Sequence, residues 1–136
     1  MLINNKDGFM KLFLILGNQL FPKNYIEEYK YTHTFFMAED YGLCKYMKPS
    51  KNKILLFLSA MRSYAEHLKR NDFKIEYIDA EHPQFKDDYI SKLDTSINDK
   101  QITCVTMFEI EDKFFEEAVV DFFKKKKIEY HFLKSP

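Results

Sequence analysis

Five segments rich in apolar residues recur along the chain and predict the strands of one sheet; in the third of them apolar and charged residues alternate. The first, residues 11–16, carries no charge after Lys11. An uninterrupted apolar run of this length fits a strand that is covered on both faces, as the strands of a parallel sheet are. The other four segments are residues 34–38, 73–78, 102–107 and 128–133.

Between these segments, apolar residues recur at helical spacing. Residues 51–70 have apolar positions three and four apart, which form one stripe of Ile54, Phe57, Leu58, Met61, Ala65 and Leu68. Residues 87–97 and 112–127 predict two further helices, and residues 25–29 a short one. Because strands and helices alternate, we expect an α/β fold: a five-stranded parallel sheet in the order 3-2-1-4-5, Rossmann-like, with helices on both faces.

The composition indicates a single domain. A chain of 136 residues buries roughly two-thirds of the surface that it exposes when unfolded. We expect residues 10–136 to form this domain and residues 1–9 to be a flexible N-terminal extension. The 21 basic and 21 acidic residues balance, so the overall charge gives no reason to expect direct binding of nucleic acid.

The sequence also predicts a cytoplasmic protein. No apolar run approaches the ~20 residues that a membrane-spanning helix needs, and residues 1–10 lack the apolar core of a signal peptide. Cys44 and Cys104 are too few and too far apart to suggest a disulfide framework or a Cys-x-x-Cys site.

Several kinds of chemistry have no recognisable motif in this sequence. Its three glycines form neither a dinucleotide-binding fingerprint nor a phosphate-binding loop, and there is no Gly-x-Ser-x-Gly motif. The four histidines, His33, His67, His82 and His131, lie far apart without metal-ligand spacing. We therefore predict no catalytic residues and no metal site.

Polar residues follow three of the predicted strands. They are Asn18 and Gln19 after the first strand, Glu39 and Asp40 after the second, and Glu109 and Glu111 after the fourth. Ligands of open α/β sheets bind outside the carboxyl ends of the strands, so these residues are candidates for one pocket. The same pattern also fits acids that cap helices or face water, and the spacing alone leaves both interpretations open.

Four stretches carry a resemblance to a known family. They are residues 14–20, which contain Gly17-Asn18-Gln19-Leu20 where the family usually has Gly-Asp-Gln-Leu, residues 36–40, residues 53–62 and residues 133–136. On these stretches the chain resembles the N-terminal α/β domain of the photolyase-related proteins, the bacterial iron-sulfur cryptochrome and photolyase branch. Asn18 replaces the usual Asp, and Pro49-Ser50 stands where a His pair is common.

The resemblance implies an antenna domain. Such a domain can hold the chromophore 6,7-dimethyl-8-ribityllumazine and pass its excitation to FAD. The FAD and the iron-sulfur cluster belong to a helical domain that follows, and this chain ends where that domain should begin. We therefore expect the chain to be inactive as a lyase alone and to serve light-dependent DNA repair or light signalling in a full-length parent.

The same resemblance implies the residues that would bind the chromophore. Gly17, Asn18, Gln19 and Leu20 would line one wall of the pocket. Glu39 would hydrogen-bond the polar edge of the ring system, and Tyr41 would stack on it. Met37 and Glu109, which lie at neighbouring strand ends, complete the expected set.

Two alternatives from other functional classes remain. The domain would be an interaction module without a pocket if it docks on a helical partner through exposed aromatic residues. The other alternative is a small nucleotide-binding α/β protein, although the phosphate-binding loops are missing from the sequence. A rise in thermal stability on addition of a nucleotide would favour it.

Overall fold

The computed structural model describes residues 10–40 and 51–136. Its centre is a parallel five-stranded sheet in the order β3-β2-β1-β4-β5. The predicted fold class and strand order are therefore confirmed. The strands are β1 (Lys11–Leu14), β2 (Thr34–Ala38), β3 (Ile75–Ile78), β4 (Cys104–Phe108) and β5 (Glu129–Leu133).

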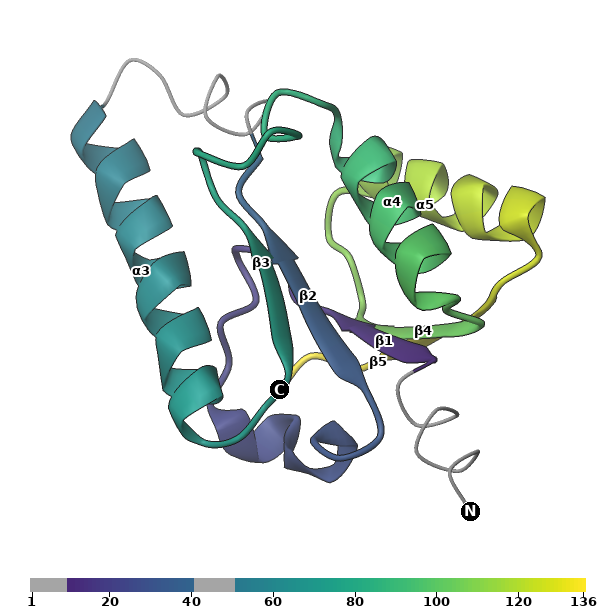
Figure 1. The fold of residues 1–136 in the computed structure, drawn as a ribbon, viewed down its shortest axis with the longest axis horizontal. Helices are drawn as coiled ribbons and strands as arrows, with labels where there is room; N and C mark the ends of the chain where they lie inside the picture. Colours follow the sequence, from purple (N-terminus) through teal and green to yellow (C-terminus); the bar gives the residue numbers. More distant parts are fainter. Residues whose placement is uncertain (1–9, 41–50) are drawn as a thin grey trace.

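Helices cover both faces of this sheet (Figure 1). Helix α3 (Lys51–Arg70) lies on one face, and helices α4 (Tyr89–Lys100) and α5 (Lys113–Lys126) lie on the other. Two 3-10 turns, η1 (Lys23–Tyr25) and η2 (Glu27–Tyr29), connect β1 to β2. None of the helices in the described parts of the chain combines the length and apolar character needed to cross a membrane.

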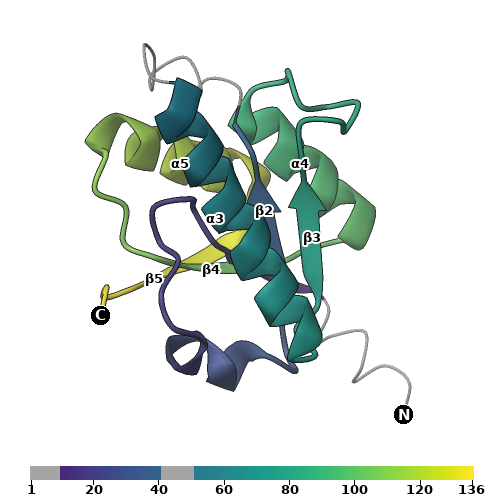
Figure 2. The same cartoon turned by 90° about the vertical axis from the view of Figure 1, so that its left-hand side faces the viewer.

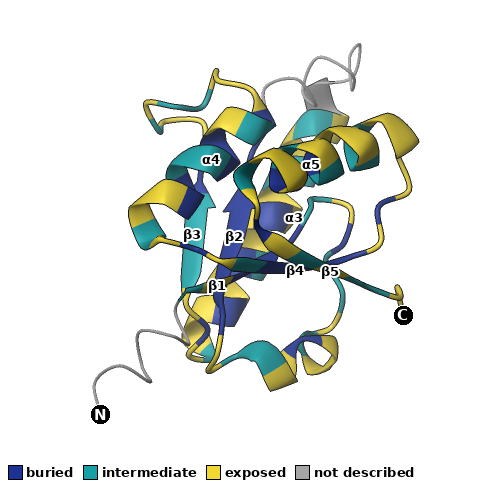
Figure 3. Cartoon of the chain, turned by 90° about the vertical axis from the view of Figure 1, so that its right-hand side faces the viewer, coloured by how far each residue is buried: buried dark blue, intermediate teal, exposed yellow. Residues whose placement is uncertain are grey.

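The strands supply both halves of the core because their side chains alternate between the two faces. On β1, Leu12 and Leu14 join the cluster beneath α4 and α5, whereas Phe13 joins the cluster beneath α3. Figure 3 shows the outward surfaces of α4 and α5 as exposed, β2 as buried and β3 as partly buried. Because β1, β2 and β4 are covered on both faces, their segments consist mainly of apolar residues.

The observed element boundaries differ from the predicted ones by a few residues. Strand β1 ends at Leu14 although the apolar run continues to Leu16, and α4 runs three residues beyond its predicted end at Ile97. The predicted short helix at residues 25–29 is a pair of 3-10 turns. The difference at the end of β1 is small, because the Ile15 N–H still donates to Phe36 O of the neighbouring strand at 3.0 Å.

Candidate functional site

A cavity of about 290 Å³ opens at the carboxyl edge of the sheet. It lies where the chain order reverses between β1 and β4, the place where open α/β sheets bind their ligands. Its volume is at the small end of the range of about 300 to 1,000 Å³ typical of small-molecule sites. The lining consists of Leu16, Gly17, Asn18, Gln19, Ala38, Asp40, Phe57, Met61, Tyr89, Ile110, Glu111, Asp112 and Phe115.

The first wall is the loop after β1. Gly17 allows α3 to approach it closely, since a Cβ atom at this position would lie 2.6 Å from the Phe57 ring and 3.0 Å from Met61 Sδ. Gln19 is almost fully buried, and its Nε2 donates to Glu109 O at 2.9 Å. Its Oε1 is buried without a hydrogen-bond partner among the described residues. A buried carbonyl oxygen of this kind can accept a hydrogen bond from a ligand. The free-energy cost of removing this oxygen from water is already borne by the folded protein.

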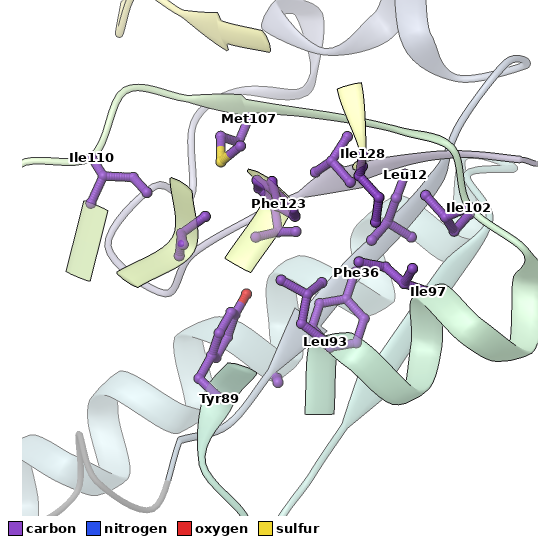
Figure 4. Close-up of a cluster of buried hydrophobic side chains, with 14 of the residues drawn as sticks. Leu12, Phe36, Tyr89, Leu93, Ile97, Ile102, Met107, Ile110, Phe123 and Ile128 are labelled. Atoms are coloured by element: carbon purple, nitrogen blue, oxygen red, sulfur yellow. The ribbon is translucent and has the colours of Figure 1, made fainter. Parts of the chain in front are cut away.

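The opposite wall is built by the first turns of α4 and α5. The Tyr89 ring packs edge-on against Phe115 and Phe36, with centroid separations of 5.3 and 6.0 Å. Figure 4 shows its hydroxyl pointing from α4 towards the strand-end side chains of Met107 and Ile110. This hydroxyl is buried and finds no partner among the described residues. Burial raises the pKa of Tyr89, and the nearby Asp40 raises it further, so the hydroxyl stays protonated and can donate.

The charged groups around the cavity are acidic. Asp40, Glu111 and Asp112 line it, and none of the described lining residues is basic. The helix N-termini are also occupied, because Asp112 Oδ1 accepts from the N–H groups of Phe114 and Phe115, and Asp88 caps α4. A phosphate would therefore meet negative charge and few free amides here, unlike a phosphate at an open helix N-terminus.

Glu39 lies beside the cavity rather than in its lining, with no exposed surface. Arg62 binds both carboxylate oxygens, through Nε at 2.6 Å and Nη2 at 2.9 Å, and the Tyr77 hydroxyl donates at 2.6 Å. The backbone oxygen of Glu39 accepts from the buried Lys92 Nζ at 2.9 Å. The hydrogen bonds and charge of Glu39 raise the pKa of Arg62, and burial together with Glu39 raises the pKa of Tyr77. The Glu39 carboxylate thus links β2, β3 and α3.

The structure brings together only some of the residues predicted to bind a ligand. Gly17, Asn18 and Gln19 line the cavity. Leu20 and Met37 instead belong to the apolar cluster beneath α3, and Glu109 contributes its backbone oxygen to Gln19. Tyr41 lies outside the described residues.

Several lining residues were missed because their sequence pattern indicated something else. Phe57 and Met61 belong to the apolar stripe of residues 51–70, and Tyr89 and Phe115 fall within the helices predicted at residues 87–97 and 112–127, so their pattern indicates core packing. Tyr89 and Phe115 lie in the first turns of α4 and α5, at the carboxyl edge of the sheet, whereas Phe57 and Met61 lie farther along α3. Position in the first helical turn was the available signal: Tyr89 directly follows the N-cap Asp88, and Phe115 lies three residues after the N-cap Asp112.

The lining contains no thiol, imidazole or amine among its described members, and no nucleophile paired with a base. The described lining offers a ligand apolar contacts and a few polar groups.

Comparison with known proteins identifies the family of the chain. No curated protein matched the sequence. The family described as "Deoxyribodipyrimidine photo-lyase-related protein" matches residues 13–136, which is nearly the whole chain. The chain therefore belongs to the family of deoxyribodipyrimidine photo-lyase-related proteins.

Proposed function

We propose that this domain binds a small aromatic chromophore, 6,7-dimethyl-8-ribityllumazine, in the cavity at the carboxyl edge of the sheet. It serves as the antenna of a cytoplasmic photolyase-related flavoprotein, whose FAD and iron-sulfur cluster belong to a separate helical domain. The domain itself binds and positions the chromophore and performs no bond-breaking step.

The observation that carries this proposal is a mainly apolar, aromatic-lined cavity with two buried polar atoms that have no hydrogen-bond partner among the described residues. Gln19 Oε1 can accept one hydrogen bond and the Tyr89 hydroxyl can donate another. A ring system with polar edges supplies both partners while its faces contact Phe57 and Phe115. The acidic lining favours an uncharged ring over a phosphate-bearing nucleotide, which weighs against the nucleotide-binding alternative.

Titration with the lumazine tests the proposal directly. We expect a red-shifted and more strongly fluorescent bound species when the chromophore leaves water for the cavity. No change in absorbance or fluorescence with tens of micromolar chromophore would contradict it.

Tyr89→Phe is the sharper test of the binding geometry. The substitution removes a hydroxyl that has no partner in the described structure, so the free energy of unfolding should stay the same or rise. Loss of one hydrogen bond should nevertheless weaken chromophore binding by roughly fivefold. Glu66→Gln on the exposed side of α3 is the matched control and should bind as the wild type does. Equal affinities for wild type and Tyr89→Phe would mean that the chromophore does not use this hydroxyl.

A second role, docking on a helical partner, is favoured by two exposed leucines on α3. Leu55 is 62% and Leu56 is 72% exposed, and both precede the cavity-lining Phe57 in sequence. Large apolar side chains exposed in adjacent positions often mark an interface. The helical FAD domain, supplied as a separate polypeptide, should co-elute with the wild type and not with Leu56→Glu. Co-elution of both would remove α3 from the interface.

A further inference from the structure

A second group of chemically reactive side chains lies at the opposite edge of the sheet, where β4 and β5 begin. Cys104 is the first residue of β4 and lies opposite Glu129, the first residue of β5. His131 follows two residues later on β5, opposite Thr106. Residues two apart on a strand point to the same face, and neighbouring strands lie about 4.8 Å apart. The register therefore places all three side chains on one face.

The atoms that could bind a metal are close together. The Cys104 sulfur, one carboxylate oxygen of Glu129 and one imidazole nitrogen of His131 all lie within 4.8 Å of one another. His131 and Glu129 are also hydrogen-bonded. Both are exposed and Cys104 is partly buried, so a cation can reach the group from solvent.

The position of β5 accounts for this exposure. It is an edge strand, separated from β2 and β3 by β1 and β4. Figure 2 looks onto the α3 face and shows β5 extending past α3 towards the C-terminus. The group also lies at the amino ends of its strands, away from the cavity at their carboxyl ends.

Thiolate, imidazole and carboxylate are together the ligand types that Zn²⁺ selects. With bonds of about 2.0 to 2.3 Å, the ligand atoms of a tetrahedral zinc site are separated by roughly 3.5 Å. No two of the three atoms need to approach by more than about 1.3 Å, which side-chain rotation at an exposed edge can provide. We propose that Cys104, Glu129 and His131 form a Zn²⁺ site whose fourth position is open to water or another ligand.

Nearby charges set the conditions for binding. Lys11 lies opposite Cys104 on β1 and adds a positive charge beside the site. Burial and the charge of Glu129 raise the pKa of the Cys104 thiol, whereas Lys11 lowers it. Because zinc binds the thiolate, binding must release this proton and becomes tighter as the pH rises.

Calorimetry with Zn²⁺, and absorption spectroscopy with Co²⁺ as the probe, test the site in the full chain. We expect one bound ion per chain and, with Co²⁺, a thiolate charge-transfer band together with the intense visible bands of a tetrahedral ion. His131→Gln and Glu129→Gln should each lower the affinity by roughly tenfold or more. Cys104→Ser should abolish the charge-transfer band. His67→Gln, an exposed histidine on α3, is the matched control and should bind normally.

Alkylation gives an independent readout that does not depend on variants. Zn²⁺ should slow the reaction of Cys104 with iodoacetamide, and mass spectrometry of the Cys104 peptide should show this protection. Far-UV circular dichroism of each variant confirms that the fold persists. The proposal is overturned if Zn²⁺ leaves the alkylation rate of Cys104 unchanged, or if the folded Cys104→Ser and His131→Gln variants bind Zn²⁺ as the wild type does.

Discussion

A carboxylate without exposed surface needs donors, and Glu39 has three side-chain hydrogen bonds from Arg62 and Tyr77. Glu39→Gln keeps the shape of the side chain but removes the charge that both partners bind. We expect the free energy of unfolding to fall by about 2 kcal/mol, since hydrogen bonds to charged groups contribute about 1.5 to 3 kcal/mol and Arg62 remains half exposed. Urea denaturation at neutral pH measures this change.

Glu66→Gln, on the exposed side of the same helix as Arg62, is the control for Glu39→Gln. It should change the free energy of unfolding by less than about 0.5 kcal/mol. If Glu39→Gln were equally mild, the carboxylate would not be a structural link between β2, β3 and α3.

His33 makes the stability of the fold depend on pH. It is buried at the start of β2, with Nδ1 2.8 Å from Thr32 Oγ1 and Nε2 3.4 Å from Thr106 Oγ1. Burial, and to a lesser extent Lys11, lowers its pKa from 6.5 to about 4. The unfolded chain therefore binds a proton between pH 6.5 and 4 that the folded chain does not, so stability must fall as the pH drops through this window.

The pH effect is measured by comparing wild type with His33→Gln. One proton of difference corresponds to at most about 1.4 kcal/mol per pH unit. Urea denaturation across the window should give a steeper loss of stability for wild type than for His33→Gln, whatever the absolute stability of the variant. Parallel curves for the two proteins would mean that His33 is protonated in the folded state as readily as in the unfolded one.

Single residues also show how far sequence alone reaches at this site. Gln19 follows an apolar strand, so its position at the sheet edge was predictable. Its bond to Glu109 O joins residues 90 positions apart, and no local pattern reveals such a bond. The same is true of Arg62 and Glu39, which are 23 positions apart. The sequence places polar groups at strand ends but does not show which of them are occupied by other side chains.

The elements were more predictable than their contacts. The limits of β2 and α3 match the prediction to the residue, because the strand is an unbroken apolar run and the helix has a regular stripe. Agreement is weaker where a chain reversal rather than periodicity ends the element. Helices α4 and α5 end at Lys100 and Lys126, and the C-cap residues that follow them, Gln101 and Lys127, have φ angles of 54° and 59°. Neither is a glycine or asparagine, so the usual signal of a helix end was missing.

The contact between the β1 loop and α3 controls the size of the cavity. In Gly17→Ala the new Cβ would lie 2.6 Å from the Phe57 ring, so the ring must move. Both residues line the cavity, and we expect the movement to weaken chromophore binding by roughly tenfold while costing only about 1 kcal/mol of stability. Fluorescence titration and urea denaturation measure the two effects.

A compensating substitution separates crowding from other causes of this loss. Phe57→Leu removes the ring that the new methyl group meets, so Gly17→Ala should cost less stability in a Phe57→Leu background than in the wild type. If the cost of Gly17→Ala is the same in both backgrounds, crowding against Phe57 is not the explanation.

Over the whole molecule, balanced charge conceals an uneven distribution. The cavity edge carries Asp40, Glu111 and Asp112, whereas Lys124 to Lys127 lie at the far end of α5. Acids at the start of α5 and lysines at its end both stabilise this helix, because they interact favourably with its dipole. The same pattern makes the cavity unfavourable for anions although the net charge is zero.

The two proposed sites lie at opposite edges of one sheet, separated by about 15 Å of strand. The strands between them are packed on both faces, so we expect a rigid connection and little energetic coupling. Saturating Zn²⁺ should change the affinity for the lumazine by less than about twofold. The increases in unfolding free energy produced by the two ligands should add. Fluorescence titration with and without Zn²⁺, together with thermal unfolding, measures this.

A larger effect of Zn²⁺ would require a physical route between the edges, and the end of β5 offers one. Beyond Leu133, the Ser135 N–H donates to Glu109 Oε1 at 3.3 Å, and Glu109 O in turn accepts from Gln19 in the cavity wall. Glu109→Gln weakens the first contact and keeps the backbone bond to Gln19. If Zn²⁺ changed the chromophore affinity in wild type and not in Glu109→Gln, β5 would transmit the binding of the ion to the antenna pocket.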